Sequence, residues 1–268
     1  MRDILQKIVD HKRHDLIFQK EAVPTNSLEK SALFSRDCLS MAQSLLDPEK
    51  SSIISEFKRY SPSKLDINTH STVAEVTAAY NAAGASGLSV LTNAEFFKGT
   101  NEDVFQARHA NADIPILRKE FIVDEYQILE AKAIGADCIL LIAECLSDKE
   151  VALFAKFART LGLEVLLEVH TQDQLVKVTE DINIVGVNNR NLKTFEVDLD
   201  NSIRILEHMP KHVVRISESG ISNVDTIIRL QKAGFQGFLI GECFMKEQNP
   251  GAAAQAFMEE LRRSLRSL

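Results

Sequence analysis

A unit that recurs along the chain constrains the fold more than any other feature: a helical pattern ends at a glycine, and a β-rich apolar run follows a short turn. It reads AAGASGLSVLT, AIGADCILLIA, TLGLEVLLEV and KAGFQGFLIG, with the closing glycines Gly84, Gly135, Gly162 and Gly234. Glycine suits the left-handed position that ends a helix. The apolar runs lack polar alternation, which indicates strands buried on both faces, as in parallel sheets covered by helices.

The same pattern predicts eight strands, separated by segments long enough for crossover helices. Their expected ranges are Ser52–Lys58, Gly87–Thr92, Ile114–Lys119, Cys138–Ile142, Glu164–Val169, Ile184–Asn188, Val213–Ser217 and Gly237–Gly241. Two crossover segments, which start at Ser147 and Thr171, match the capping-box pattern of a helix N-terminus. Eight βα units predict an α/β fold, a closed (β/α)₈ TIM barrel, with an open doubly wound sheet as the alternative.

Residues 1–50 precede this repeat, and we expect them to form a helical extension of a single barrel domain (1–268) whose barrel spans 51–268. An amphipathic helix is expected there, because apolar residues recur at helical spacing: Ile4, Leu5, Ile8, Val9 and Leu16. This helix either covers the barrel or, with the loop after it, reaches over the active site. Pro250–Leu265 is expected as the last helix, and we expect a monomer without a fused second enzyme.

The composition argues against several classes of protein. Lysine and arginine number 31 against 38 aspartates and glutamates, for a net charge of −7, and no long basic run offers a nucleic-acid surface. The longest apolar run, CILLIA, is too short to span a membrane, and no signal peptide is evident. Neither HExxH nor a Cys/His cluster is present, so no bound metal is expected. Four cysteines without CxxC spacing fit a reducing cytoplasm.

Charged residues end several of the apolar strands, where a barrel of this kind places its chemistry. Lys58, Lys119 and Glu168 end the first, third and fifth strands, and Glu56 should point to the same side of its strand as Lys58. Because burying an unpaired charge is costly, such charges form either structural ion pairs or a catalytic site. The convergence of three of them on the barrel axis favours acid–base catalysis.

The seventh and eighth strands lead into loops that suit a phosphate group. Ser219-Gly220 and Gly241 each precede a helix start, and would offer backbone N–H groups to an anion. Barrel enzymes frequently bind phosphate at these two loops. A tight turn is the alternative for either glycine alone. Ser61, after the first strand and so beside the eighth in a closed ring, could add donors. The pattern predicts a phosphorylated small-molecule substrate.

Seven motifs in order resemble the indole-3-glycerol-phosphate synthase family: EFKRYSPSK, SVLTNAEFFKGT, ILRKEFIVDEYQI, LLEVH, GVNNRNLKTFEVDL, RISESGI and FLIGECFM. The resemblance runs from about Ser51 to the C-terminal helix. It implies a carboxy-lyase of tryptophan biosynthesis that closes the indole ring of 1-(2-carboxyphenylamino)-1-deoxyribulose 5-phosphate, with release of carbon dioxide and water and without metal or organic cofactor.

The resemblance also implies catalytic roles. Lys119 would be the general acid that protonates the ketone oxygen as the anthranilate ring carbon attacks. Lys58 would neutralise the substrate carboxylate and donate a proton at the dehydration, with Glu168 as its acid–base partner. Glu56 would orient the lysines, and Asn188 would hydrogen-bond the substrate.

Binding residues follow from the same resemblance. Arg190 would pair with neighbouring carboxylates. The phosphate would be held by Ser61, Ser219, Gly220, Gly241 and Glu242, the last three through backbone N–H groups. The apolar pocket around the aromatic ring would include Phe97, Phe121 and Leu192.

Three positions depart from the family's pattern: Leu65 stands where Gly is usual, Asn93 where Asp or Glu is frequent, and Cys243 where Ser is common. Leu65 puts the flexibility of its loop in doubt. Two alternatives stay open. Phosphoribosylanthranilate isomerase is another phosphosugar barrel, but it would not need two strand-end lysines, and its expected cysteine near the end of the first strand is absent. A catalytically silent binding barrel is the other, and intact Lys58, Lys119 and Glu168 speak against it.

Overall fold

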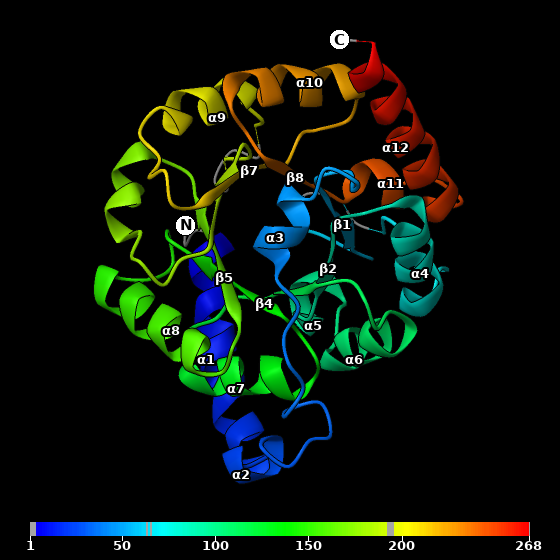
Figure 1. Cartoon of the computed structure of the whole chain (residues 1–268). Coiled ribbons are helices and arrows are strands. Elements are labelled where there is room, and N and C mark those ends of the chain that lie inside the picture. The colour runs from blue at the N-terminus through cyan, green and yellow to red at the C-terminus, as the bar shows by residue number, and fades with distance from the viewer. Residues whose placement is uncertain (1–3, 63, 65, 192–195, 268) are drawn as a thin grey trace.

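Eight parallel strands form a closed barrel in chain order in the computed structural model, which describes residues 4–62, 64, 66–191 and 196–267 (Figure 1). Pairing of Ile53 with Phe238 joins the first strand to the last and closes the ring. The strands are β1 (Ile53–Phe57), β2 (Gly87–Leu91), β3 (Ile116–Lys119), β4 (Cys138–Ile142), β5 (Glu164–Val169), β6 (Ile184–Asn188), β7 (Val214–Glu218) and β8 (Gly237–Ile240). The predicted TIM barrel is confirmed, and the open sheet was wrong.

Helices surround the barrel, as Figure 1 shows. They are α4 (Val73–Ala83), α5 (Ala94–Phe97), α6 (Asn101–Ala110), α7 (Glu125–Ala133), α8 (Asp148–Thr160), α9 (Leu199–Leu206), α10 (Val224–Ala233), α11 (Glu242–Met245) and α12 (Pro250–Arg266). The extension contributes α1 (Ile4–Ala22), α2 (Thr25–Leu28) and α3 (Met41–Leu46). Gly84 and Gly234 end α4 and α10 with φ of 94° and 119°, in the left-handed region expected for them.

One predicted crossover helix differs. Ser147 and Glu150 form the expected capping box at the start of α8, but the segment after Thr171 forms only the 3₁₀ helix η1 (Gln172–Lys177). Gln174 Oε1 still accepts a hydrogen bond from the N–H of His170 at 2.7 Å. The β-branched residues Val178 and Thr179, which follow η1 directly, disfavour a longer helix.

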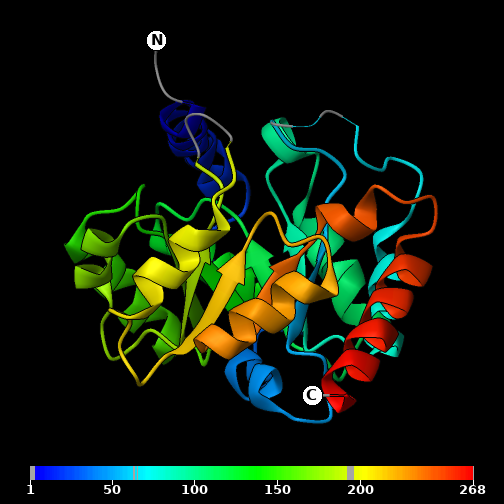
Figure 2. The same ribbon diagram turned by 90° about the horizontal axis from the view of Figure 1, so that it is seen from above.

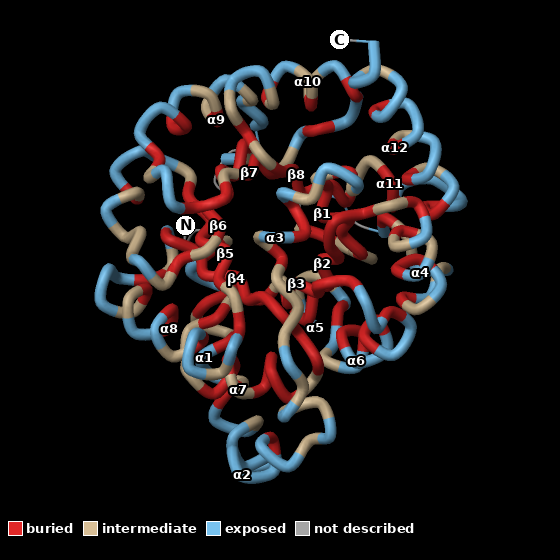
Figure 3. Tube along the Cα trace, in the orientation of Figure 1, coloured by how far each residue is buried: buried red, intermediate tan, exposed pale blue. Residues whose placement is uncertain are grey.

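The strands are buried on both faces, as their lack of alternation predicted (Figure 3). One apolar cluster lies between the strands and the outer helices, and includes Val90, Ile139 and Leu167. A second fills the barrel interior and includes Leu117 and Leu166. Met41 and Leu45 of α3 belong to this second cluster, so the extension closes the barrel at the N-terminal ends of the strands.

Helix α1 lies at the other end of the barrel from α3 (Figure 2). Its apolar face is buried at Leu5, Ile8, Val9 and Leu16, as predicted, while Ile4 is half-buried. The buried Lys12 ammonium contacts the Glu120 carboxylate at 3.0 Å, just beyond the end of β3. The extension therefore reaches both ends of the barrel, and its description as part of one domain, 1–268, stays a prediction. Among the described residues, no helix has both the length and the apolar character to cross a membrane.

Candidate active site

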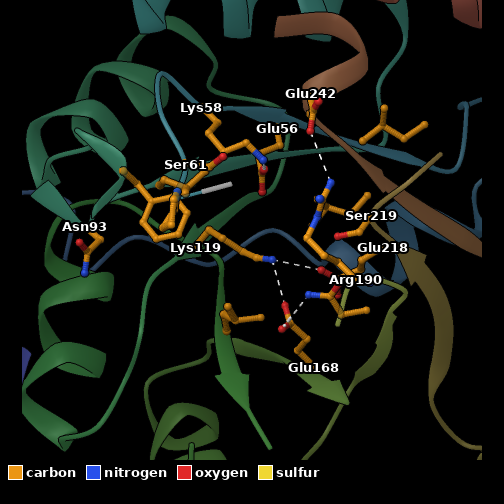
Figure 4. A pocket seen from close by; sticks show the side chains of 18 of the residues that line it. Glu56, Lys58, Ser61, Asn93, Lys119, Glu168, Arg190, Glu218, Ser219 and Glu242 are labelled. Atoms are coloured by element: carbon orange, nitrogen blue, oxygen red, sulfur yellow. Dashed lines mark hydrogen bonds and ion pairs between the residues drawn. The ribbon is translucent and has the colours of Figure 1, made fainter. Parts of the chain in front are cut away.

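A cavity of about 310 Å³ opens at the C-terminal ends of the strands (Figure 4). It brings together nearly all the site residues predicted from the sequence. Those that line it are Glu56, Lys58, Ser61, Phe97, Lys119, Phe121, Glu168, Asn188, Arg190, Ser219, Gly220, Gly241 and Glu242. Leu192 lies outside the described residues. Because these residues lie at the ends of several strands or in the segments that follow them, the closed barrel gathers them around one space.

Lys119, at the end of β3, is held between two buried carboxylates. Its Nζ lies 3.2 Å from Glu168 Oε2 and 3.1 Å from Glu218 Oε2, as the dashed lines in Figure 4 mark. Burial acts to lower the pKa of the ammonium, but Glu218, Glu168 and Glu56 outweigh it and raise the pKa above its ordinary value. Lys119 is therefore charged and carries a proton to give.

Glu168, at the end of β5, has a different set of neighbours. Its Oε1 accepts a hydrogen bond from Asn188 Nδ2 at 3.1 Å and lies 3.6 Å from His170 Nε2. Burial would raise the pKa of this carboxyl, but Lys119, His170 and Asn188 together lower it below its ordinary value. Glu168 is thus ionised, and its carboxylate can accept a proton.

Glu218 was not among the residues predicted for the site. The predicted seventh strand stopped at Ser217, but β7 continues through Glu218, whose side chain enters the cavity. Burial raises the pKa of its carboxyl to about 7, despite Lys119. Among the described residues, Oε1 has no hydrogen-bond partner. A side chain at Gly186 on β6 would collide with that oxygen, so the glycine makes room for it. The motif RISESGI carried the signal, because alternation from Ile216 predicts an inward Glu218.

Glu56 and Lys58 form a second pair on β1 and just after it. They point to the same side, as predicted, with Glu56 Oε1 at 2.8 Å from Lys58 Nζ. Ser89 on β2 donates to the other carboxylate oxygen at 3.1 Å. Burial would raise the pKa of Glu56, but Lys58 and Lys119 lower it below its ordinary value. The site therefore holds two lysines, each beside at least one carboxylate.

The loops after β7 and β8 form the end of the cavity that was predicted to hold phosphate. Ser219 and Gly220 both adopt left-handed backbone conformations, with φ of 70° and 76°. Among the described residues, the N–H groups of Gly220 and Ser222 have no hydrogen-bond acceptor. Such donors are what an anion requires. Ser61 lines the same cavity from the loop after β1.

Glu242 lies beside two cations. Arg190, expected to pair with a carboxylate, contacts it at 3.5 Å, and Lys64 contacts it at 3.4 Å. These contacts connect the loops after β1, β6 and β8 around the phosphate end of the cavity. The Glu242 side chain is thereby engaged with cations, which leaves its backbone as the group to meet an anion.

An apolar wall stands away from the phosphate end. The rings of Phe97 and Phe121 lie with centroids 6.1 Å apart and a tilt of 33°. Ile4, Leu5 and Ile8 of α1 also line the cavity. The N-terminal helix thus reaches the candidate cavity, in agreement with the sharper of the two expectations for it. Sequence reasoning placed Ile4, Leu5 and Ile8 on the face of that helix but not in the site.

The model of the family described as "Indole-3-glycerol phosphate synthase" matches residues 5–257. The chain belongs to this family. Relatives with that name include one from Bacteroides thetaiotaomicron, 44% identical over 97% of this chain and 100% of its own length. Those from Laribacter hongkongensis and Salinibacter ruber are 42% and 41% identical, and cover 94% and 96% of this chain and 98% and 96% of their own. The family comprises decarboxylating lyases of tryptophan biosynthesis.

Two solved structures of low sequence identity are similar in fold to this member of the indole-3-glycerol phosphate synthase family. The tryptophan synthase alpha subunit from Legionella pneumophila has a TM-score of 0.62 at 12% identity, covering 86% of this chain and all of its own. KGPDC from Streptococcus mutans has a TM-score of 0.59 at 18% identity, with 79% and 97% covered. Such low identities support the barrel and carry no argument on chemistry.

Two departures from the family's pattern can be located in the structure. Asn93 caps α5 by accepting from the N–H of Phe96 at 3.0 Å, and donates to Glu120 at 3.3 Å. Cys243 lines the cavity beside Gly241, with its Sγ 3.6 Å from the carbonyl oxygen of Ser222. Neither displaces a predicted catalytic group. The third, Leu65, lies outside the described residues.

Proposed function

We propose that this member of the indole-3-glycerol phosphate synthase family converts 1-(2-carboxyphenylamino)-1-deoxyribulose 5-phosphate to indole-3-glycerol phosphate, and that the five residues Glu56, Lys58, Lys119, Glu168 and Asn188 carry the reaction. The observation that carries the assignment is the position of Lys119. Its ammonium lies between Glu168 and Glu218, at 3.2 and 3.1 Å, in a cavity with anion-binding loops at one end and an aromatic wall elsewhere.

Ring closure begins when the anthranilate ring carbon that bears the carboxylate attacks the ketone. Negative charge develops on the ketone oxygen, and a nearby ammonium both stabilises this charge and donates its proton. Lys119 is that ammonium in our assignment. The phenyl group then lies against Phe97 and Phe121, and the phosphate lies against Ser219, Gly220, Gly241 and Glu242, with Ser61 as a further donor.

Decarboxylation follows because loss of carbon dioxide restores the aromatic ring, so the step requires no electron-accepting cofactor. Lys58 is assigned to the substrate carboxylate, and its contact with Glu56 at 2.8 Å fixes its direction. Asn188 Nδ2 donates to Glu168 at 3.1 Å, so the amide can hold both the Glu168 carboxylate and a substrate hydroxyl. Among the described residues, no group of three His, Cys, Asp or Glu side chains is placed to hold a metal ion.

Dehydration requires one proton on the leaving hydroxyl and removal of another from the carbon next to the nitrogen. Glu168, ionised by its neighbours, is the base in this assignment, and Lys58 is the acid. Over the whole reaction, Lys119 and Lys58 each give one proton to the substrate, and Glu168 takes one proton from it. Each turnover thus takes up one proton from solvent, which matches the loss of a carboxylate as neutral carbon dioxide.

The wider setting is also proposed. The four cysteines all lie in described residues and none forms a disulfide, which fits a cytoplasmic location. We further propose a monomer whose partner is the phosphorylated substrate alone. Cell fractionation and sedimentation of the purified protein test these two points.

The activity is tested by mixing purified protein with the proposed substrate and recording indole fluorescence. We expect the signal to rise with time and to reach the substrate concentration, with one carbon dioxide released per indole. A protein with Lys119→Met serves as the matched control and should give little signal. Substrate consumption without indole formation, or no consumption by a folded wild-type protein, would contradict the proposal.

A further inference from the structure

A buried network of hydrogen bonds lies behind the turn at Ser219 and Gly220. Its centre is Asn189, the residue after β6, which is 3% exposed. Asn189 Nδ2 lies within hydrogen-bond distance of Ser217 Oγ at 2.9 Å, the carbonyl of Glu218 at 2.9 Å and the carbonyl of Ser219 at 3.1 Å. On its other side, Oδ1 accepts from Ser202 Oγ at 2.7 Å. One amide side chain thus binds three consecutive residues of β7 and its loop.

The backbone of Asn189 adds two hydrogen bonds to this network. Its N–H donates to the carbonyl of Glu218 at 2.9 Å, and its carbonyl accepts from the N–H of Asp198 at 3.0 Å. Ser202 on α9 also contacts Ser217, with the two hydroxyl oxygens 2.8 Å apart. The network therefore connects the end of β6, the end of β7 and helix α9. Asn189 is not among the described residues that line the candidate active-site cavity; it lines a neighbouring cavity beside Asn201.

The turn that Asn189 holds is strained. Ser219 has a φ of 70°, a left-handed conformation that a serine rarely adopts. Such a conformation persists only when the surrounding structure imposes it. The Ser219 carbonyl is bound by Asn189, and a side chain at Gly220 would collide with Val197. The turn is therefore fixed between the side chains of Asn189 and Val197.

We propose that Asn189 is a positioning residue for the phosphate group of the substrate, acting through the Ser219–Gly220 turn. The inference rests on the proposed function, in which this turn binds phosphate. By holding the carbonyls of Glu218 and Ser219 away from the cavity, Asn189 directs the following N–H groups toward the anion. Its loss would weaken binding of the phosphate in the ground state and transition state alike, which raises KM more than it lowers kcat.

The experiment compares KM, kcat and the inhibition constant of inorganic phosphate for wild type, Asn189→Ala and Asn189→Asp. We expect both variants to raise KM and the inhibition constant by about tenfold and in equal proportion, with kcat within about threefold of wild type. Asn189→Asp should be at least as impaired as Asn189→Ala. It keeps the size and the acceptor for Ser202, but it sets a carboxylate oxygen against two carbonyl oxygens.

Asn183→Ala is the matched control. Asn183 precedes the opposite end of β6, where its Oδ1 accepts from the N–H of Val165 at 3.0 Å. It should lower the urea midpoint of unfolding while leaving KM and the phosphate inhibition constant unchanged. If the Asn189 variants do not fold, Ser202→Ala is used instead. It removes the contacts of the Ser202 hydroxyl with Asn189 Oδ1 and Ser217 Oγ but keeps the Asn189 amide, so a two- to threefold rise of both constants is then expected.

The outcomes separate the two proposals. Wild type that phosphate does not inhibit competitively would refute the phosphate site itself. A second result is that phosphate inhibits wild type competitively while KM and the inhibition constant are unchanged in the folded Asn189 variants. That result would overturn the role of Asn189 alone, and the same holds for Ser202→Ala if the Asn189 variants do not fold. A fall in kcat with an unchanged inhibition constant would also overturn it, because the amide would then act through the Glu218 side chain.

Discussion

At the N-terminal ends of the strands, Asp137 is fully buried and each of its carboxylate oxygens has two partners: Arg36 and the N–H of Leu39 on Oδ1, and Arg108 and the N–H of Ile116 on Oδ2. At the C-terminal ends, Glu218 is just as deeply buried, but within the described part of the chain only its Oε2 has a partner, which is the ammonium that Glu168 also contacts. Both ends bury charge, and they satisfy it to different degrees.

This difference distinguishes buried charge that supports the fold from buried charge available to a substrate. A buried carboxylate with four partners has no remaining capacity and contributes only structure. In a cluster with more carboxylates than cations, some carboxylate oxygens remain able to interact with a substrate, and their burial lowers stability. We therefore expect substitutions at the C-terminal end to change rate, and those at the N-terminal end to change the free energy of unfolding.

Replacement of Lys119 by Met should have the largest effect. The substitution keeps the volume but removes the proton donor, so kcat should fall by at least about 10²-fold, the lower scale for a general acid. The fold should survive, as judged by circular dichroism and the urea midpoint. Turnover near the wild-type rate would reassign Lys119 to structure and abolish the distinction between the two ends.

Replacement of Glu168 by Gln should come next. The amide keeps the shape and one acceptor oxygen while it removes charge and basicity. We expect kcat to fall by about 10²- to 10⁴-fold, with a much smaller change in KM and no greater loss than in the Lys119 variant. Steady-state kinetics measure both constants. A normal kcat with a sharply raised KM would show that the carboxylate only positions substrate or balances the charge of the lysines.

Asp137→Ala tests the opposite end. It leaves the guanidinium groups of Arg36 and Arg108 without their carboxylate, and breaking a buried ion pair costs about 3–5 kcal/mol of unfolding free energy. Urea unfolding should show this loss, and kcat at a temperature where the variant is folded should stay within about twofold of wild type. A kcat that fell as far as in the Glu168 variant, with stability unchanged, would reverse the comparison.

A smaller effect is expected from the pH dependence of stability. The pKa of Glu218 is about 7 in the folded chain, above its ordinary value of 4.5. The folded state then holds a proton that the unfolded state has released, so this stabilisation is complete below about 4.5 and is lost as pH rises through 7. Urea unfolding of wild type minus that of Glu218→Gln, at several pH values, isolates the group. A difference that does not change with pH would mean that Glu218 has the same pKa in the folded and the unfolded chain.

The smallest effect should come from chelation. Because the C-terminal end supplies its charges from side chains, treatment with EDTA should leave kcat and KM unchanged. The assay compares enzyme before and after dialysis against the chelator. Activity lost on treatment and restored by a divalent ion would mean that side-chain charges alone do not account for the site.

Much of the barrel could be predicted because its signals are local. A glycine that ends a helix and an apolar run without alternation are each read within about a dozen residues, so the ranges of β4, β5 and β6 were predicted correctly. Strand ends were harder. The two residues after Ser217 look like a loop, yet pairing of Asn188 with Glu218 extends β7 by one residue and turns that carboxylate into the cavity.

The site was less predictable where a residue depends on distant parts of the chain. Lys58, Lys119 and Glu168 could be identified because charge at the end of an apolar strand is a local signal. The contribution of Ile8 to the cavity depends on the docking of α1, and the role inferred for Asn189 depends on contacts with β7 and α9. Neither leaves a mark in its own sequence neighbourhood. Gly186 is a similar case, because only the Glu218 oxygen beside it explains the missing side chain.

The contact between Lys12 and Glu120 also sets an order of events during synthesis. These residues are 108 positions apart, and a ribosome adds about 5–20 residues per second, so α1 waits about 5 to 20 s for the strand end that anchors it. During that time its apolar face has no barrel to lie on. The first helix made thus docks only after β3 has been synthesised, and until then the nascent chain exposes residues that later line the candidate cavity.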